Sequence, residues 1–389
     1  MQHYNFALIF VGFQRCCIFL TIVKELSKSH KVAIFPQKID EKTSSRIENT
    51  NKSFLELCES YGADIIYSQK ITADIEILPQ THYTQKAINY IDKNIVSQKT
   101  FWLSGVAMGN AQYEYLHEKK IDKILVVDRQ FYDFRVKQFE KEKSFKFKDN
   151  QIIEIGVPYK KYPIFPPLEI DYLIANPTPF SFCNLQDRLT YLENILLILG
   201  QIDRRKVIVL KPHNADERAD YIVNGKIYSL LSLNFLVRMH SYIDKYARFF
   251  SSIFSKWEIS DLFIQISIAI KYHSIMKRAK GLEQFTKWHN LNLEVFLPSV
   301  KEGLITGRSN SIWHGLFLKK PTYNCIDEDK PYFSDTKMHK FSMEYLNVHG
   351  NYKNMQFNNL LYEKITDQNR DIDVVEILKN ELKTISINL

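Results

Sequence analysis

The chain lacks the features that mark disordered or membrane-spanning proteins. Its 389 residues include only 12 glycines and 12 prolines, too few for a loop-rich or disordered chain. The apolar run at residues 7–12 is interrupted by Gln14 and Arg15 well before it reaches the length of a membrane span, and it does not resemble a secretion signal. We therefore expect a folded protein that stays in the cytoplasm.

Cysteine is also scarce. The five cysteines are Cys16, Cys17, Cys58, Cys183 and Cys325, and no pair of them has the spacing of a metal site. The adjacent Cys16 and Cys17 would be unusual disulfide partners. Buried, reduced thiols explain this set best, so we expect no structural disulfide and no bound metal.

Several catalytic and binding signatures are absent. There is no Walker lysine loop, no Gly-x-Gly-x-x-Gly and no His-Glu-x-x-His, which removes support for an ATPase, a dehydrogenase and a zinc protease. Asp-x-Asp, which can hold a metal-bound diphosphate, occurs only at residues 327–329 and 371–373, in charged stretches typical of a loop or a helix start. The net charge of +8 is spread along the chain without a basic tract, so we expect no nucleic-acid partner.

What the chain does contain is an alternation of strand-like and helix-like segments. In the first half we predict strands at residues 6–12, 31–35, 63–67, 99–104, 123–128 and 152–156, with helices at 17–26, 54–61 and 111–119. A proline-rich stretch at residues 157–167 follows. Strand patterns then return at 171–175, 207–210, 293–297 and 303–306, with a helix at 185–199. This alternation predicts the α/β class with parallel sheets.

Length and pattern together predict two Rossmann-like domains with a cleft between them, because 389 residues exceed the usual size of a single core. We place the N-terminal domain at residues 1–160, the C-terminal domain at 161–345, and a helical tail that packs back on the first domain at 346–389. Residues 229–288 are helical, aromatic and basic, which predicts a helical insertion in the second domain. Such a stripe suits an anionic lipid surface, although it is more often a core face with a solvated basic side.

One strand end in the second half carries groups that suit an anion. The strand at 207–210 runs into Lys211, Pro212, His213 and Asn214. Pro212 ends the strand, so His213 should lie at the carboxyl edge of the sheet, where ligands of open α/β folds bind. A histidine there can donate to a phosphate or protonate a leaving group. It can also simply satisfy a backbone carbonyl.

A second strand end has a similar character. The strand at 303–306 is followed by Arg308, Ser309, Asn310 and Ser311, at the start of a helical pattern. Free backbone N–H groups and the helix dipole favour negative charge at such a place. Helix capping alone would also explain these residues. Two such endings in one half of the chain predict a nucleotide-sugar site.

The loop after the strand at 171–175 is a third candidate wall of this site. Asn176, Thr178 and Ser181 could contact phosphate or ribose, and Phe180 could cover a base. A rigid turn is the alternative, because proline supplies a fixed φ without any ligand.

The first half offers fewer candidates. Gln14 and Arg15 follow the first predicted strand and could contact an acceptor. Asp128 and Asp133 follow a later strand, where either carboxylate could act as a general base or a nucleophile. An aspartate after a strand is also a common helix cap.

At these residues the chain resembles the two-Rossmann-domain glycosyltransferases called GT-B. Within them it is most similar to the bacterial Kdo and sialic acid transferases, capsule and lipopolysaccharide enzymes that use CMP-activated acidic sugars. Those enzymes carry a His-Pro element after a strand and a Ser-Ser/Thr element at a later helix start, both engaging the CMP phosphate. Lys211-Pro-His-Asn214 and Ser309-Asn-Ser311 occupy corresponding places, although proline precedes His213 and Asn310 separates the serines. The Asp/Glu-Asp/Glu-Gly motif of the sialyltransferases is absent, which leaves Kdo-type transfer ahead.

The resemblance implies transfer of Kdo or a related ulosonic acid from a CMP-sugar to a bacterial surface glycan, without a metal or another cofactor. In this scheme His213, Ser309 and Ser311 bind the donor phosphate, and Asp128 or Asp133 activates the acceptor. The partners are a nucleotide-sugar donor and a glycan acceptor; a lipid-linked acceptor would suit peripheral contact with the inner face of the cytoplasmic membrane. A CDP-glycerol or CDP-ribitol phosphotransferase and a non-catalytic partner in glycan assembly stay open as alternatives.

Overall fold

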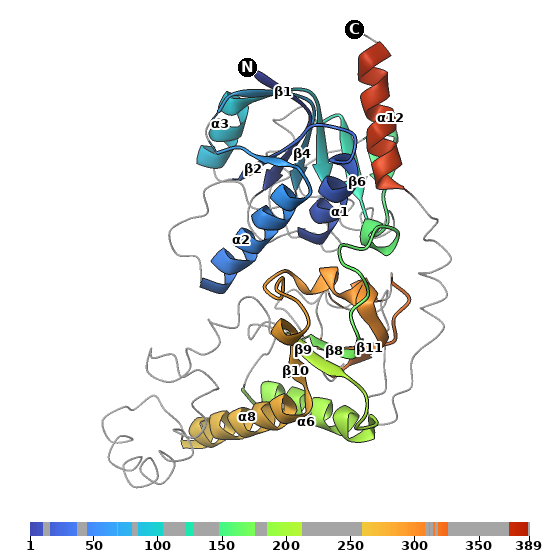
Figure 1. Cartoon of the computed structure of the whole chain (residues 1–389). Helices are drawn as coiled ribbons and strands as arrows, with labels where there is room; N and C mark the ends of the chain where they lie inside the picture. Colours follow the sequence, from blue (N-terminus) through green and yellow to red (C-terminus); the bar gives the residue numbers. More distant parts are fainter. Residues whose placement is uncertain are drawn as a thin grey trace, which may run out of the picture. The chain divides into compact units, whose positions relative to one another are not determined.

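The structure is a computed structural model of the whole chain (Figure 1). It describes residues 1–10, 16–36, 45–67, 69–79, 85–103, 121–127, 129, 148–175, 185–211, 259–307, 311, 314–315, 318–325 and 373–387. The chain divides into two compact units, Met1–Pro166 with Asn290–Pro298 and Asp367–Leu389, and Pro167–His289 with Ser299–Thr366. Each unit contains its own parallel sheet with helices, so the predicted fold class of two Rossmann-like α/β domains is confirmed.

The first unit is built on a seven-stranded parallel sheet. Its strands are β1 (Gln2–Phe10), β2 (Val32–Pro36), β3 (Asp64–Ile65), β4 (Ile71–Pro79), β5 (Ile95–Leu103), β6 (Lys123–Val126) and β7 (Ile152–Glu154). They lie in the order β3-β2-β1-β4-β5-β6-β7. The chain builds outward from β1 in one direction and from β4 in the other, so the topological switch point lies between β1 and β4.

Helices accompany this sheet. The described ones are α1 (Cys16–Leu26), α2 (Ser45–Ser60), α3 (Gln85–Asn94) and α12 (Val374–Ile387), with 3-10 turns at Asp149–Gln151, Pro158–Lys160 and Leu293–Val295. In α1 the buried residues Ile18, Ile22 and Leu26 recur every four positions, and each is at most 2% exposed. This is the apolar stripe of a helix that covers a sheet, and it is the signal that predicts a helix at residues 17–26.

Strand β4 is missing from the predicted set, although it lies in the middle of the sheet. The segment contains Asp74 and Glu76, and charged residues are rarely buried. Both are buried here, at 7% and 1% exposure. Asn5 and Gln98 donate hydrogen bonds to Asp74 at 3.0 and 3.1 Å, and Ser97 donates to Glu76 at 3.1 Å. Donors on β1 and β5 thus offset the cost of burying two carboxylates, and a local pattern does not reveal such donors.

Helix α12 begins at a capping aspartate. Asp373 Oδ1 accepts hydrogen bonds from the backbone N–H groups of Val375 (3.0 Å) and Glu376 (3.2 Å). Its Oδ2 accepts from Lys161 (2.7 Å) and from the Tyr162 hydroxyl. Asp373 therefore starts a helix and attaches it to the rest of the first unit, which accounts for the late Asp-x-Asp sequence without a metal.

We expect Asp373→Ala to lower the free energy of unfolding by about 1 kcal/mol, the usual cost of losing an N-cap. Partial burial acts to raise the pKa of Asp373, but hydrogen bonds from Lys161, Tyr162 and the Glu376 backbone outweigh it and hold this pKa below its ordinary value. A carboxyl with a lowered folded-state pKa stabilises the fold above its unfolded pKa and stops doing so as the pH falls through the folded value. In urea unfolding, the difference in unfolding free energy between the wild type and Asp373→Ala should be full at pH 7 and shrink below about pH 4. A difference that is as large at pH 2 as at pH 7 would contradict this account.

The second unit has a five-stranded parallel sheet. Its strands are β8 (Ile170–Ala175), β9 (Ile208–Lys211), β10 (Lys280–Gly281), β11 (Val300–Thr306) and β12 (Thr322–Asn324), in the order β10-β9-β8-β11-β12. The described helices are α6 (Leu185–Gln201) and α8 (Ile259–Arg278), with a 3-10 turn at Leu282–Gln284; a further 3-10 turn, Leu297–Ser299, lies where the chain passes from the first unit to the second. The switch point of this sheet lies between β8 and β11.

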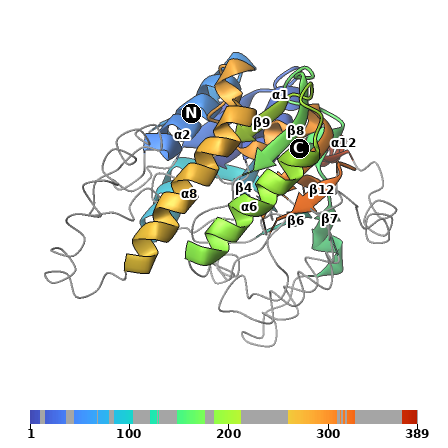
Figure 2. The same ribbon diagram turned by 90° about the horizontal axis from the view of Figure 1, so that it is seen from below.

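The described part of the predicted helical insertion at residues 229–288 contains the helix α8 and the short strand β10. Helix α8 leads directly into β10, which pairs in parallel with β9, so both belong to the sheet and its covering layer. Ile268, Tyr272 and Ile275 of α8 are buried in the core of this unit. Helices α6 and α8 lie side by side (Figure 2). The apolar stripe of α8 is therefore a core face; residues 229–258 lie outside the described residues.

The strand predicted at residues 293–297 is wrong. Leu293–Val295 and Leu297–Ser299 form successive 3-10 turns. Val295, Phe296 and Leu297 are buried consecutively, and Phe165 stacks on Phe296 with ring centroids 5.6 Å apart. A short apolar run cannot be assigned to a strand by periodicity alone, and here packing within the first unit decides its conformation.

The cysteines whose side chains the structure describes are buried, as predicted. Cys17, Cys58 and Cys325 are buried and form no disulfide, while the side chain of Cys16 and the whole of Cys183 lie outside the description. Burial raises the pKa of the Cys58 and Cys325 thiols, so neither is a nucleophilic thiolate near neutral pH. In the described part of the chain, no helix has both the length and the apolar character needed to cross a bilayer.

Candidate functional site

Four strands of the second unit end in one row of paired residues. Lys211 at the end of β9 pairs with Ala175 at the end of β8. Ala175 pairs with Thr306 of β11, and Thr306 pairs with Asn324 of β12. Because neighbouring strands are about 4.8 Å apart, this row of strand ends is about 14 Å long. The switch point falls between Ala175 and Thr306, where ligands of open α/β sheets bind.

Hydrogen bonds hold the row in place. Thr306 Oγ1 donates to the carbonyl of Ala175 at 3.1 Å, and the Tyr191 hydroxyl of α6 donates to the same carbonyl at 3.2 Å. Asn194 of α6 donates to the carbonyl of Cys325 at 2.9 Å. The three donors are each at most 5% exposed. Helix α6 is thus attached to two of the strand ends, which gives a ligand site at this edge a rigid base.

Lys211 brings a positive charge to the edge. It is the last residue of β9 and is 7% exposed. A lysine can pack its aliphatic stem against a core while its ammonium group reaches the surface of the sheet edge. Because the effective dielectric constant near buried groups is lower than in water, a phosphate held beside this ammonium would gain more than at an open surface.

The segment after β11 adds a histidine that the sequence analysis does not single out. Ser311 and His314 are both in helical conformation, and His314 is 6% exposed. Residues three apart in a helix lie on the same side, so the Ser311 hydroxyl and the His314 imidazole belong to one face of this segment. The sequence does carry the signal, since His314 falls one helical turn after Ser311.

Gly315 lets this segment approach the sheet closely. A Cβ atom added at Gly315 would lie 2.4 Å from Thr322 Oγ1 and 3.2 Å from Leu304 Cδ2. Both neighbours are fully buried, on β12 and β11 respectively. The segment that carries Ser311 and His314 therefore packs directly on β11, which ends beside the switch point, and on its neighbour β12.

Of the predicted donor-site residues, the structure describes two, Lys211 and Ser311. It brings Lys211 into the row of strand ends and places Ser311 in the helical segment after β11, the strand beside the switch point. The others lie outside the described residues: Asn176, Thr178, Ser181, His213, Asn214, Arg308, Ser309 and Asn310. The strands that precede these residues, β8, β9 and β11, all end in the row. The roles of the eight residues stay predictions.

In the first unit, the predicted residues Gln14, Arg15, Asp128 and Asp133 also lie outside the described residues. Gln14 and Arg15 follow β1, one of the two strands at the switch point of that sheet. Strand β6, which precedes Asp128, lies three positions from β1 in the sheet, roughly 14 Å away at the usual strand spacing. The switch-point rule therefore favours Gln14 and Arg15 as ligand contacts over Asp128.

Metal ligands do not cluster in the described part of the chain. No group of three or more histidine, cysteine, aspartate or glutamate side chains there could hold a metal ion. The chemistry that the described edge offers is electrostatic and hydrogen-bonding, from an ammonium, hydroxyl groups and an imidazole.

The known proteins to which this chain is similar are solved structures of low sequence identity. No protein-family model and no curated protein sequence matches this chain. Among solved structures, it is similar to a Methanocaldococcus jannaschii UDP-GlcNAc 2-epimerase in complex with UDP-GlcNAc and UDP, with 12% identity, a TM-score of 0.45, and 93% of this chain and 98% of the other covered.

Two further solved structures are similar over the whole chain. A variant of the wall teichoic acid polymerase TagF has 12% identity and a TM-score of 0.47, with 100% of this chain and 88% of the other covered. The calicheamicin glycosyltransferase CalG4 has 8% identity and a TM-score of 0.42, with 100% and 98% covered. At such identities a likeness concerns the fold and leaves the reaction open.

Proposed function

We propose that this protein is a glycosyltransferase that binds a nucleotide-sugar donor at the carboxyl edge of its second sheet. The supporting observation is the row of strand ends at the switch point, with the buried Lys211 in it. Open α/β sheets bind nucleotides at this place. We further propose a CMP-linked acidic sugar, Kdo or a related ulosonic acid, as the donor, on the basis of the sequence elements around His213 and Ser309–Ser311.

Catalysis in this proposal is mainly electrostatic. Breaking the bond between sugar and nucleotide leaves negative charge on the departing CMP phosphate. Lys211, the helix start at Ser311 and the imidazoles of His213 and His314 are the groups that we assign to neutralise it. Fixed donors aimed at developing charge are commonly the largest single contribution to such catalysis.

The acceptor is assigned to the first unit. Gln14 and Arg15 would contact it, and Asp128 or Asp133 would remove the proton of the attacking hydroxyl. The acceptor class is a growing bacterial surface glycan, free or lipid-linked, which the enzyme would meet in the cytoplasm or at the inner face of the membrane.

A nucleotide screen tests the donor site. We expect CMP to raise the melting temperature of the protein more than CDP, UDP or GDP does at equal concentration. A ligand at 100 times its Kd stabilises the folded state by about 2.7 kcal/mol, which is readily measured by differential scanning fluorimetry. If none of the four nucleotides shifts the melting temperature, the protein has no nucleotide site and acts as a non-catalytic partner in glycan assembly.

Product analysis then separates two transferases that both release CMP. A glycosyltransferase adds no phosphorus to the acceptor, whereas a CDP-glycerol or CDP-ribitol phosphotransferase adds one phosphate with each unit that it transfers. Incubation with CMP-Kdo and with CDP-glycerol, followed by phosphorus analysis of the polymer, decides between them. Turnover of CDP-glycerol alone would replace the proposed reaction while retaining the proposed site.

A further inference from the structure

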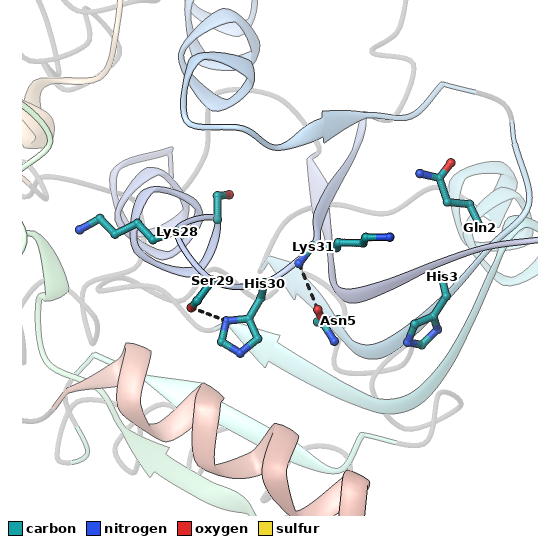
Figure 3. A pocket seen from close by; sticks show the side chains of 8 residues that line it. Gln2, His3, Asn5, Lys28, Ser29, His30 and Lys31 are labelled. Carbon is teal, nitrogen blue, oxygen red and sulfur yellow. Dashed lines mark hydrogen bonds between the residues drawn. The ribbon is translucent and has the colours of Figure 1, made fainter.

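The first unit has a polar pocket at the edge opposite to its expected ligand site. Residues 27–31, which connect α1 to β2, and the first residues of β1 form its wall around a volume of about 680 Å³ (Figure 3). This is where β1 begins, whereas Gln14 and Arg15 follow the point where β1 ends. The volume lies within the range of roughly 300–1,000 Å³ of small-molecule sites.

Unpaired positive charge faces this pocket. Lys31 is exposed and makes no ion pair with any described residue, and its side chain reaches toward Gln2 and His3 (Figure 3). Lys28, in contrast, points the other way and is paired with Glu25. Burial, and then the positive charge of Lys379 on α12, lowers the pKa of His30. Lys31 is thus the lysine whose charge is available to a ligand.

The carboxylates near the pocket already have hydrogen-bond or ion-pair partners. Asp74 accepts hydrogen bonds from Asn5 and Gln98, and the Nε2 atom of His3 lies 3.4 Å from its Oδ1. Glu25 is engaged by Lys28. Among the described residues, no carboxylate around the pocket lacks a partner, so the site offers little to a cation and a net positive field to an anion.

Neutral donors complete the wall. The Oγ atom of Ser27 is buried and has no hydrogen-bond partner among the described residues. Ser29 Oγ and His30 Nδ1 are 2.8 Å apart, and the backbone N–H of Lys31 donates to Asn5 Oδ1 at 3.0 Å (Figure 3). A buried hydroxyl without a partner costs free energy, and an acceptor oxygen of a ligand would satisfy it once the Ser27 side chain turns toward the pocket.

We propose that this pocket binds a phosphate group. A lysine ammonium is a point charge suited to a tetrahedral phosphate, and no arginine lines the pocket to offer the planar, bidentate pairing that carboxylates prefer. The C-terminus of α1 lies nearby and disfavours an anion. A charge-assisted hydrogen bond from the Lys31 ammonium is stronger than this unfavourable effect of the helix end. The site is independent of the proposed donor site.

The phosphate can belong to a soluble monoester or to a lipid headgroup, and the probes distinguish them. Glycerol 3-phosphate is titrated by calorimetry at low ionic strength, and vesicles containing phosphatidic acid are tested by co-sedimentation. Binding of glycerol 3-phosphate in solution identifies a small-molecule site. Binding of the vesicles alone identifies a headgroup site. If the wild-type protein binds neither, the proposal is wrong.

Three variants locate the binding. Lys31→Met should weaken it about ten-fold, because it removes the available charge. Lys52→Met is the control with the same charge change, on α2 of the same unit and outside the pocket wall, and it should alter binding little. Ser27→Ala should weaken binding without lowering the melting temperature of the free protein, because the hydroxyl has no described partner to lose. Equal losses for Lys31→Met and Lys52→Met would mean diffuse attraction and would overturn the assigned site.

Discussion

Lys211→Met should lower turnover with the CMP-sugar donor by about 100-fold, the loss typical of removing one preorganised donor from developing negative charge. Lys211 is 7% exposed at the end of β9, beside the switch point of the second sheet. Methionine keeps most of the volume and removes the charge. The melting temperature of the variant is measured beside its turnover, so that a loss of folding is told apart from a loss of the positive charge.

Lys206→Met is the matched control for this experiment. Lys206 precedes the same strand at the opposite edge of the sheet and is paired with Glu302. Its side chain is 38% exposed, and exposed ion pairs contribute about 0–1 kcal/mol to stability. Steady-state kinetics with CMP-sugar should therefore show normal turnover for this variant. If both variants retain full turnover, the donor phosphate does not lie at the carboxyl edge of the second sheet.

The strands that frame the site could be predicted because each is a short apolar run that stops at polar residues. Strands β8, β9 and β11 were expected at 171–175, 207–210 and 303–306, and they end at Ala175, Lys211 and Thr306. The fold class follows from the same alternation of segments. Neither the order of the strands nor their register can be obtained this way, since both depend on contacts between segments more than 30 residues apart.

The errors arise where tertiary contacts override local pattern. Strand β4 was missed because Asp74 and Glu76 suggest an exposed segment, and only donors on β1 and β5 make their burial tolerable. Strand β10 is two residues long, Lys280–Gly281, and no periodicity can reveal it. In the site, the close approach of Gly315 to Thr322, which seats the segment carrying His314 on the sheet, is a tertiary contact that a local pattern does not reveal.

Gly315→Ala should destabilise the protein by about 1–3 kcal/mol and lower turnover about ten-fold. The new methyl group would meet Thr322 Oγ1 at 2.4 Å, and this hydroxyl is buried and donates to the carbonyl of Lys320 at 3.0 Å. The helical segment must move away from the strands, which displaces His314 and Ser311 from the strand ends. Thermal unfolding and steady-state kinetics with CMP-sugar measure the two effects.

Two further variants show whether this close approach is the cause. Gly200→Ala makes the same change in α6, where nothing lies within 4 Å of the added atom, and it should stabilise the protein by about 0.5–1 kcal/mol through helix propensity. Adding Thr322→Ala to Gly315→Ala removes the clashing hydroxyl, since the remaining Cβ lies at an ordinary 3.6 Å. The double variant should therefore lose about 1 kcal/mol less unfolding free energy than the sum of the losses of the two single variants. Simple additivity would mean that the segment carrying His314 is not held by this contact, and its assignment to the donor site would lose its structural basis.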